Sequence, residues 1–197
     1  MQLQLEDAVW LDAGCGTGAV SEALAQGGAR VVSLDLADQR LRMIAPTPFL
    51  QASAERLPFR AEIFDGVVSS NVLEHTPRPF TMIRELVRVC RAGGYLYLSW
   101  TNWLSPWGGH ELSPLHYLGP RFGLRAYRWT RGRPPQNVPG ENLFILHAGT
   151  VLKALRRSGL EILDVSPRYW PWLRFLGRVP GLREFAMWNC AILLRKP

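Results

Sequence analysis

The sequence contains few lysines and few cysteines, and it has no long apolar run. Only 2 of its 23 basic residues are lysine, and its cysteines are Cys15, Cys90 and Cys190, far apart and without histidine partners at zinc-binding spacing. Such a set argues against a disulfide framework or a metal site. No apolar run approaches the roughly 18 residues that a membrane span needs, and no cationic segment precedes a secretory core. We therefore expect a cytoplasmic protein with reduced thiols and no metal.

The composition is otherwise ordinary for a globular chain. The 197 residues are long enough for one domain with a full core. Their apolar share of 47% and charged share of 20% are typical of globular proteins. The net charge of +7 comes from arginine. A basic surface can meet nucleic acid, anionic lipid or an acidic substrate, and charge alone does not choose among them.

A glycine-rich turn follows the first apolar stretch. In the run Val9–Gly18, apolar residues lead into Asp12, and glycines follow at positions 14, 16 and 18. A helical stretch begins at Ala19. Because glycine lacks a Cβ and tolerates positive φ, such a turn brings bare backbone against a small ligand. The next predicted strand ends in Asp35, where a carboxylate can accept hydrogen bonds from a ribose diol.

Two nucleotide-binding families share these residues. Gly14-x-Gly16-x-x-Ala19 fits the dinucleotide fingerprint of an NAD-linked oxidoreductase, although the pattern alone is weak. The run Asp12–Gly18 also resembles motif I of the class I S-adenosylmethionine-dependent methyltransferases. Four later segments are similar to further motifs of the small-molecule (type 11) branch of that family, in order and at family spacing: Ser53–Phe59, Phe64–Asp65, Leu73–His75 and Arg88–Gly94. Five ordered segments favour the methyltransferase.

Predicted strands and helices alternate along the chain, as a parallel sheet requires. The predicted strands are Ala8–Asp12, Val31–Asp35, Phe49–Ser53, Phe64–Ser70, Tyr95–Trp100, Glu161–Val165 and Trp188–Arg195. The predicted helices are Ala19–Gln26, Asp38–Ala45, one from Pro77 or Pro79 to the glycine pair Gly93–Gly94, Pro120–Arg131 and Thr150–Arg157, the last capped by Thr150. The resemblance implies an α/β, Rossmann-like class I methyltransferase fold over residues 1–197. Its seven-stranded sheet would be mostly parallel with an antiparallel last strand and helices on both faces.

The resemblance also implies the residues that hold S-adenosyl-L-methionine and its product S-adenosylhomocysteine. Asp12 would orient the turn and help hold the methionine amino group. Gly14, Gly16 and Gly18 would pass beneath the methionine part, and Asp35 would bind both ribose hydroxyls.

Adenine recognition departs from the family pattern. Relatives often carry an acidic residue where Ser53 stands, so binding would rely on the Ala54 backbone and on apolar packing by Leu36 or Leu57. The remaining predicted cofactor residues are Cys15, Glu55 and Asn71.

Methyl transfer asks the protein to align a nucleophile and exclude water. A hydroxyl acceptor would benefit from a histidine base, and the candidates are His75, His110 and His116. Each lone histidine is more often structural than catalytic. We expect a small-molecule acceptor, with oxygen as the first choice. Nucleic acid is not expected, because Ser70–Leu73 lacks the Asn/Asp-Pro-Pro-aromatic motif of base methylases.

Residues 101–147 break the regular pattern with an aromatic and basic insertion, which we expect to form a substrate lid. Within it, the helix predicted at 120–131 would be solvated and docked by Phe122 and Trp129, an interpretation we favour over a membrane-surface face. Residues 169–185 add further aromatic and apolar residues among arginines, and this stretch would pack on the sheet edge, line a substrate pocket or touch lipid. These stretches suggest a hydrophobic or lipid-linked acceptor and peripheral membrane contact.

Two alternatives come from other classes. One is the NAD-linked oxidoreductase. The other is a non-catalytic S-adenosylmethionine-binding regulator or partner subunit. Ser53 and the short stretch before the first strand are the features that suggest it. The oligomeric state stays open.

Overall fold

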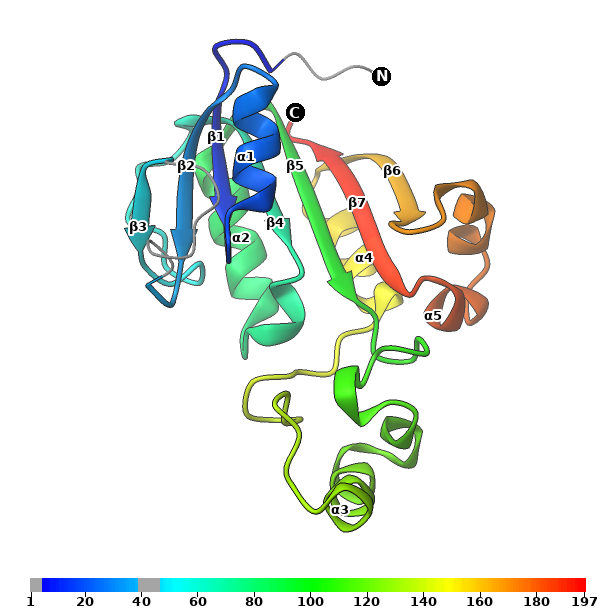
Figure 1. Cartoon of the computed structure of the whole chain (residues 1–197). Coiled ribbons are helices and arrows are strands. Elements are labelled where there is room, and N and C mark those ends of the chain that lie inside the picture. Colours follow the sequence, from blue (N-terminus) through cyan, green and yellow to red (C-terminus); the bar gives the residue numbers. More distant parts are fainter. Residues whose placement is uncertain (1–4, 39–46) are drawn as a thin grey trace.

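The computed structural model describes residues 5–38 and 47–197 and is built on one seven-stranded sheet (Figure 1). The strand order is β3-β2-β1-β4-β5-β7-β6. The first five strands pair in parallel, and β7 runs antiparallel to both β5 and β6. Their bounds are Val9–Ala13 (β1), Arg30–Asp35 (β2), Phe49–Gln51 (β3), Phe64–Ser70 (β4), Cys90–Thr101 (β5), Glu161–Pro167 (β6) and Asn189–Arg195 (β7). The predicted Rossmann-like methyltransferase fold is confirmed.

Helices cover both faces of this sheet. In Figure 1, α1 lies on one face, and α2 and α4 lie on the other. The bounds are Ala19–Gln26 (α1), Pro79–Val89 (α2), Pro120–Arg131 (α3), Ala148–Arg157 (α4) and Leu182–Ala186 (α5). The helix predicted at 38–45 lies, from residue 39 on, outside the described residues. In the described ranges, no helix combines the length and the apolar character that crossing a membrane requires.

The end of α2 differs from the prediction. The helix stops at Val89, and β5 already begins at Cys90, before the two glycines. The glycines continue the strand pairing rather than end a helix: Gly93 N donates to Lys196 O at 2.8 Å, and Lys196 N donates to Gly94 O at 2.9 Å. The partner that extends the strand therefore comes from the far end of the sequence.

Helix α4 begins two residues earlier than predicted, and its cap is not Thr150. The carboxylate of Glu184, in α5, accepts hydrogen bonds from Ala148 N at 3.0 Å and Gly149 N at 2.8 Å. These are orphan amides of the first helical turn, and a negative charge there also interacts favourably with the helix dipole. The Thr150 prediction was wrong because the cap comes from a different element.

Helix α3 has the predicted bounds but a different docking face. Its buried residues are Gly123 and Tyr127, whereas Phe122 is 70% and Trp129 is 87% exposed. A Cβ at Gly123 would lie 2.5 Å from Leu115 O, so the helix packs closely on the preceding turn through its glycine. Docking by Phe122 and Trp129 is therefore wrong, and both aromatic side chains face outward.

The carboxyl ends of the parallel strands share one edge of the sheet. The segment 101–147 extends beyond that edge, and the segment 169–186 lies outside β6 (Figure 1). Open α/β sheets bind ligands at this edge, where the strand order reverses between β1 and β4. The fold thus places the insertion 101–147 on the side where a site is expected, and segment 169–186 at the outer edge of the sheet beside β6.

Candidate active site

A cavity of about 730 Å³ lies at the carboxyl ends of β1, β2 and β4. Its walls come from the turn after β1, the end of β2, the segment after β3 and the chain after β4. They include nine of the predicted cofactor residues: Gly14, Cys15, Gly16, Asp35, Leu36, Ser53, Ala54, Glu55 and Asn71. The remaining two, Asp12 and Gly18, support the turn from outside the cavity.

The turn after β1 needs glycine for two different reasons. Gly14 has a φ of +85°, and a Cβ there would lie 2.2 Å from Cγ2 of Val72. Gly18 is the N-cap of α1, with a φ of 82°. Both φ values lie in the left-handed region that side chains disfavour. The turn is also held in place, since Gly14 N and Cys15 N both donate to Leu34 O at 2.7 and 3.0 Å.

Asp12 is buried beneath this turn. Its Oδ2 accepts a hydrogen bond from Ser21 Oγ at 2.7 Å, and Ser21 Oγ lies 2.7 Å from Ser33 Oγ. Burial raises the pKa of Asp12 to about 6, against the lowering effect of the Ser21 hydrogen bonds and with a smaller raising effect from Asp35. The carboxyl group therefore links β1 to α1 and, through Ser21, to Ser33 of β2.

Asp35 places its carboxylate at the cavity wall. Oδ2 accepts from Gly16 N at 2.9 Å, and Oδ1 accepts from Ala37 N at 3.0 Å. Each carboxylate oxygen has a second lone pair, so these bonds leave capacity for two hydroxyl donors. A bare glycine turn beside an orienting carboxylate fits a nucleoside ligand with a ribose diol.

Glu55 braces the segment after β3 against the chain that follows β4. Glu55 accepts hydrogen bonds from Thr76 Oγ1 and Arg78 N, and it forms an ion pair with Arg78 at 2.7 Å. The Thr76 hydrogen bond is the largest of several effects that lower the pKa of Glu55. Ser53 Oγ accepts from Glu55 N at 3.2 Å, and Leu36 is 73% exposed beside it. Glu55 thus holds the wall together while Ser53 and Leu36 remain at its surface.

Cys15 lines the cavity but is not activated. Burial raises the pKa of its thiol to about 12, and Asp12 and Asp35 add to the effect. Since the thiolate is the nucleophilic form, Cys15 stays protonated at neutral pH. Its role is that of a small side chain filling the turn.

Arg168 also lines the cavity, and sequence reasoning missed it. It follows β6, and its Nη1 donates to Ser70 Oγ, 98 residues away, at 2.7 Å. Asn71 is held nearby with a φ of 58°, and its Oδ1 accepts from Asn189 Nδ2 at 2.6 Å. No local signal marks Arg168, because it reaches the end of β4 only through the assembled sheet, in which β6 pairs with β7, β7 with β5 and β5 with β4.

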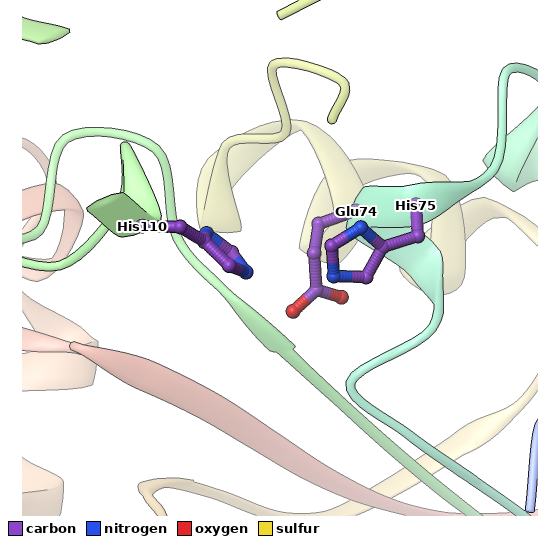
Figure 2. Close-up of side chains that lie close together, drawn as sticks. All are labelled: Glu74, His75 and His110. Atoms are coloured by element: carbon purple, nitrogen blue, oxygen red, sulfur yellow. The ribbon is translucent and has the colours of Figure 1, made fainter. Parts of the chain in front are cut away.

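Two of the three predicted histidines meet beside the cavity. His75 lines it, and its ring centroid lies 5.1 Å from that of His110, with an interplanar angle of 83°. Figure 2 shows these rings together with the carboxylate of Glu74, all three pointing toward one another. Glu74 was not singled out in the sequence, although it stands in the Leu73–His75 motif.

The electrostatics of this trio are set by burial. Burial is the largest effect on Glu74 and raises its pKa, although the Thr101 amide, which donates to Oε1 at 2.8 Å, opposes that shift. The pKa of His110 is lowered, first by burial and then by the neighbouring His75. A neutral imidazole is therefore favoured at His110.

His116 lies away from the trio. It is fully buried inside the insertion, its ring centroid 5.4 Å from that of Trp103 and 4.1 Å from that of Tyr117. Its Nε2 lies 3.2 Å from Ser105 O, and burial lowers its pKa. Within the described ranges, His116 does not line the cavity, and its contacts are those of a core residue of the insertion.

Aromatic rings continue from the trio along the surface, starting at Trp107, which is 59% exposed. A second cavity of about 200 Å³ is lined by Thr101, Trp107 and His110. The ring of Trp107 lies 5.8 Å from that of Trp188, which lies 4.6 Å from that of Trp170. A third cavity of about 370 Å³ opens beside Trp170 and Trp188 and includes Trp172. We call Trp107, Trp188, Trp170 and Trp172 the tryptophan row.

Comparisons with known proteins agree with this geometry. A family model described as a methyltransferase domain matches residues 11–98. An uncharacterized methyltransferase of Mycolicibacterium vanbaalenii is 37% identical over 192 residues, covering 94% of this chain and 75% of that protein. Another from Mycobacteroides abscessus is 39% identical over 199 residues, with the same two coverages.

A solved structure shares the fold. The crystal structure of an S-adenosylmethionine-dependent methyltransferase from Mesorhizobium loti superposes with a TM-score of 0.66 at 20% identity, covering 99% of this chain and 94% of that one. The protein described here therefore belongs to the class I S-adenosylmethionine-dependent methyltransferases, and not to the NAD-linked oxidoreductases that share its glycine pattern.

Proposed function

We propose that this methyltransferase methylates an oxygen atom of a small acceptor with a large apolar part, such as a lipid-linked molecule. The observation that carries the proposal is the tryptophan row, which starts at Trp107 beside the polar trio and runs along the surface of the protein to Trp172. A purely polar acceptor would have no use for such a row. An apolar body could lie along it while its reactive end reaches the cavity.

The cofactor end of the cavity is assigned to S-adenosylmethionine. The glycine turn would lie under its methionine part, and Asp35 would accept hydrogen bonds from its ribose. Leu36 and the chain around Ser53 would contact the adenine. When bound, the cofactor supplies a methyl group already activated on a sulfonium. The chain must therefore position the acceptor, exclude water and manage one proton.

The acceptor end is assigned to the trio. His75 presents its ring at the cavity wall, between the cofactor end and the second cavity. Glu74, His75 and His110 would lie around a hydroxyl acceptor held there. They would accept its proton, or accept a hydrogen bond from it, as the methyl group is transferred. An oxygen acceptor is favoured over an amine because a hydroxyl must lose its proton to become a strong nucleophile, whereas a neutral amine attacks through its lone pair and has less need of these groups.

The insertion 101–147 is proposed as the lid over this end. It already contacts the trio, since Asn142 O lies 2.7 Å from His75 Nδ1 and Phe144 N donates to Glu74 O at 2.7 Å. It also contributes Trp107 and His110 to the second cavity. Movement of this segment would expose or cover both histidines together.

Membrane contact is proposed for the outer end of the row. Trp172 is 70% and Phe175 is 56% exposed, and they stand among Arg174 and Arg178 in the segment 169–186. Exposed aromatics beside arginines are typical of a surface that meets anionic lipid headgroups. An acceptor dissolved in that layer would enter the row directly.

The test is a search for the acceptor by phase. The purified protein is incubated with labelled S-adenosylmethionine and with either the organic or the aqueous fraction of a cell extract, and formation of labelled product is measured. We expect label in an organic-soluble product, as a methyl ether or a methyl ester, and much less label with Asp35→Ala. Label only in an aqueous product, or on nitrogen or carbon, would contradict the proposal.

A further inference from the structure

Three metal-ligating side chains converge beside the cofactor cavity. One ligand atom from each of Glu74, His75 and His110 lies within 4.8 Å of the others (Figure 2). Glu74 and His75 belong to the 3₁₀ turn Leu73–His75 after β4, and His110 opens the turn His110–Leu112 in the insertion. The cluster therefore joins the turn after β4 to the insertion 101–147.

The cluster contains polar atoms that the protein leaves unsatisfied. Glu74 is only 1% exposed, and its Oε1 accepts from the Thr101 amide. Its Oε2 and the Nδ1 of His110 are buried and have no hydrogen-bond partner in the part of the chain that the structure describes. A buried carboxylate oxygen without a partner is costly, so a bound cation or proton is the expected complement.

His75 is already oriented as a ligand. Its Nδ1 lies 2.7 Å from Asn142 O, and a carbonyl can only accept, so the ring proton resides on Nδ1. The lone pair of Nε2 is then free. A backbone carbonyl that fixes the far nitrogen in this way is the usual outer partner of a metal-bound histidine.

We propose that Glu74, His75 and His110 bind a divalent transition metal, with Zn²⁺ as the reference ion. Two imidazoles and one carboxylate form a ligand set that suits zinc and its first-row neighbours, and three protein ligands leave at least one position open. Ligand atoms bound at about 2.1 Å in a tetrahedral site lie roughly 3.4 Å apart, so the side chains close inward when the ion binds.

The cluster lies next to the proposed acceptor path. His75 lines the cofactor cavity, and His110 lines the second cavity with Thr101 and Trp107, so the ion would sit between them. An acceptor hydroxyl that binds the ion has a lower pKa and loses its proton to water more readily. This consequence rests on the proposed function, but it makes the metal, instead of a free imidazole, the group that activates the hydroxyl. Metal binding itself does not rest on it.

The test measures metal binding directly on the full chain. The protein is stripped with a chelator, and Zn²⁺ is titrated against a chromophoric chelator. Co²⁺ is then added to report nitrogen and oxygen ligation through its visible spectrum. We expect one equivalent of Zn²⁺, with affinity lowered about 100-fold or more in His75→Ala and in His110→Ala.

The matched control is His147→Ala. His147 lies outside the cluster, with its Nδ1 3.9 Å from Glu184 Oε2, and its removal should leave the Zn²⁺ affinity unchanged. If His110→Ala does not fold, His110→Gln takes its place, because Gln keeps much of the side-chain volume. Absence of saturable binding, or equal affinity in His75→Ala and His147→Ala, would overturn the site.

Binding of S-adenosylhomocysteine is measured on the same samples. Intact binding of this product with no metal binding would overturn the metal site alone. Intact metal binding with methyl transfer only to a polar acceptor, or with none, would overturn the proposed function and leave the site standing.

Discussion

Two regions of the molecule build their surfaces in different ways. We call the region around the cavity at the ends of β1, β2 and β4 the cofactor half, because we propose that it binds the cofactor, and we call the segments 101–147 and 169–186 together the aromatic half. In the cofactor half, the cavity wall is made by backbone turns and side chains within a few positions of the strand ends, such as Gly14 after β1 and Asp35 at the end of β2. In the aromatic half, the row is made by side chains that meet across the sequence, as Trp107 meets Trp188. The first surface depends on local geometry and the second on long-range packing.

The two halves also differ in what they bury. The cofactor half buries Asp12 inside a hydrogen-bonded set, whereas segment 169–186 leaves large apolar side chains exposed among arginines. A change in the first half should therefore affect folding and cofactor binding together. A change in the second should affect what the surface binds, with little effect on stability.

The largest effect is expected from Gly14→Ala. A Cβ at this φ of +85° would overlap Val72, so left-handed strain of about 1–2 kcal/mol adds to a packing cost of about 1–3 kcal/mol. Gly16→Ala is the matched variant, because its φ is +51° and no described heavy atom lies within 4 Å of its built Cβ. Urea denaturation should show a clearly larger loss for Gly14→Ala. Equal losses would mean that the contact with Val72 is unimportant.

Asp12→Asn tests the buried carboxyl by its pH dependence. Burial raises the pKa of Asp12 from 3.8 to about 6, so the native state binds this proton more tightly than the unfolded chain does. The resulting stability is present below about pH 4 and is lost as the pH rises through about 6. Asn has no such titration. The free energy of unfolding of Asp12→Asn minus that of the unmodified protein should therefore increase by up to about 3 kcal/mol over this range.

The measurement for Asp12 is a series of urea titrations of both proteins across that pH range. Since the other titrating groups are common to the two proteins, their effects cancel in the difference. A difference that does not change with pH would show that the Asp12 pKa is not raised in the folded protein.

Asp35→Ala should weaken binding of S-adenosylhomocysteine by about 10- to 100-fold. The reason is the loss of charge-assisted hydrogen bonds to the ribose, worth about 1.5–3 kcal/mol in total. Isothermal titration calorimetry measures the affinity. Glu161→Ala removes an exposed carboxylate at the start of β6 and serves as the control. Similar affinities for the two variants would remove Asp35 from the cofactor site.

The smallest effect on stability is expected from Trp172→Ala. The side chain is 70% exposed, so the free energy of unfolding should change by no more than about 0.5 kcal/mol. The fraction of the Trp172→Ala variant that sediments with anionic liposomes should nevertheless fall several-fold, because an interfacial tryptophan is lost. Ile63→Ala, which alters an exposed apolar residue just before β4, should bind as the unmodified protein does. Equal binding by both variants, or no binding by the unmodified protein, would contradict membrane contact through this segment.

The cofactor half could be predicted well from sequence. The bounds of α1 and β4 agree with the prediction, and nine of the eleven predicted cofactor residues line one cavity. These signals act over a few residues: a glycine permits a left-handed turn, and a strand end fixes where the next side chain points. Such effects belong to the backbone and do not depend on distant partners.

The prediction was weaker where a partner is distant. Thr150 was expected to cap α4, but Glu184 does so, and Phe122 and Trp129 of α3 face outward although their spacing suggested docking. The sequence pattern of an amphipathic helix identifies stripes of residues, but it does not say which stripe meets the rest of the protein. That choice is made by the surface on which the helix packs.

The sequence by itself determined the family, the glycine turn and Asp35, because each depends on residue types at short, fixed spacing. Only the tertiary structure decided that Arg168 enters the cavity at the ends of β1, β2 and β4 and that Glu74 and His75 face His110. These groups are brought together by strand pairing and by the path of the insertion. Chain connectivity leaves such contacts open until the sheet is assembled, and burial then fixes them.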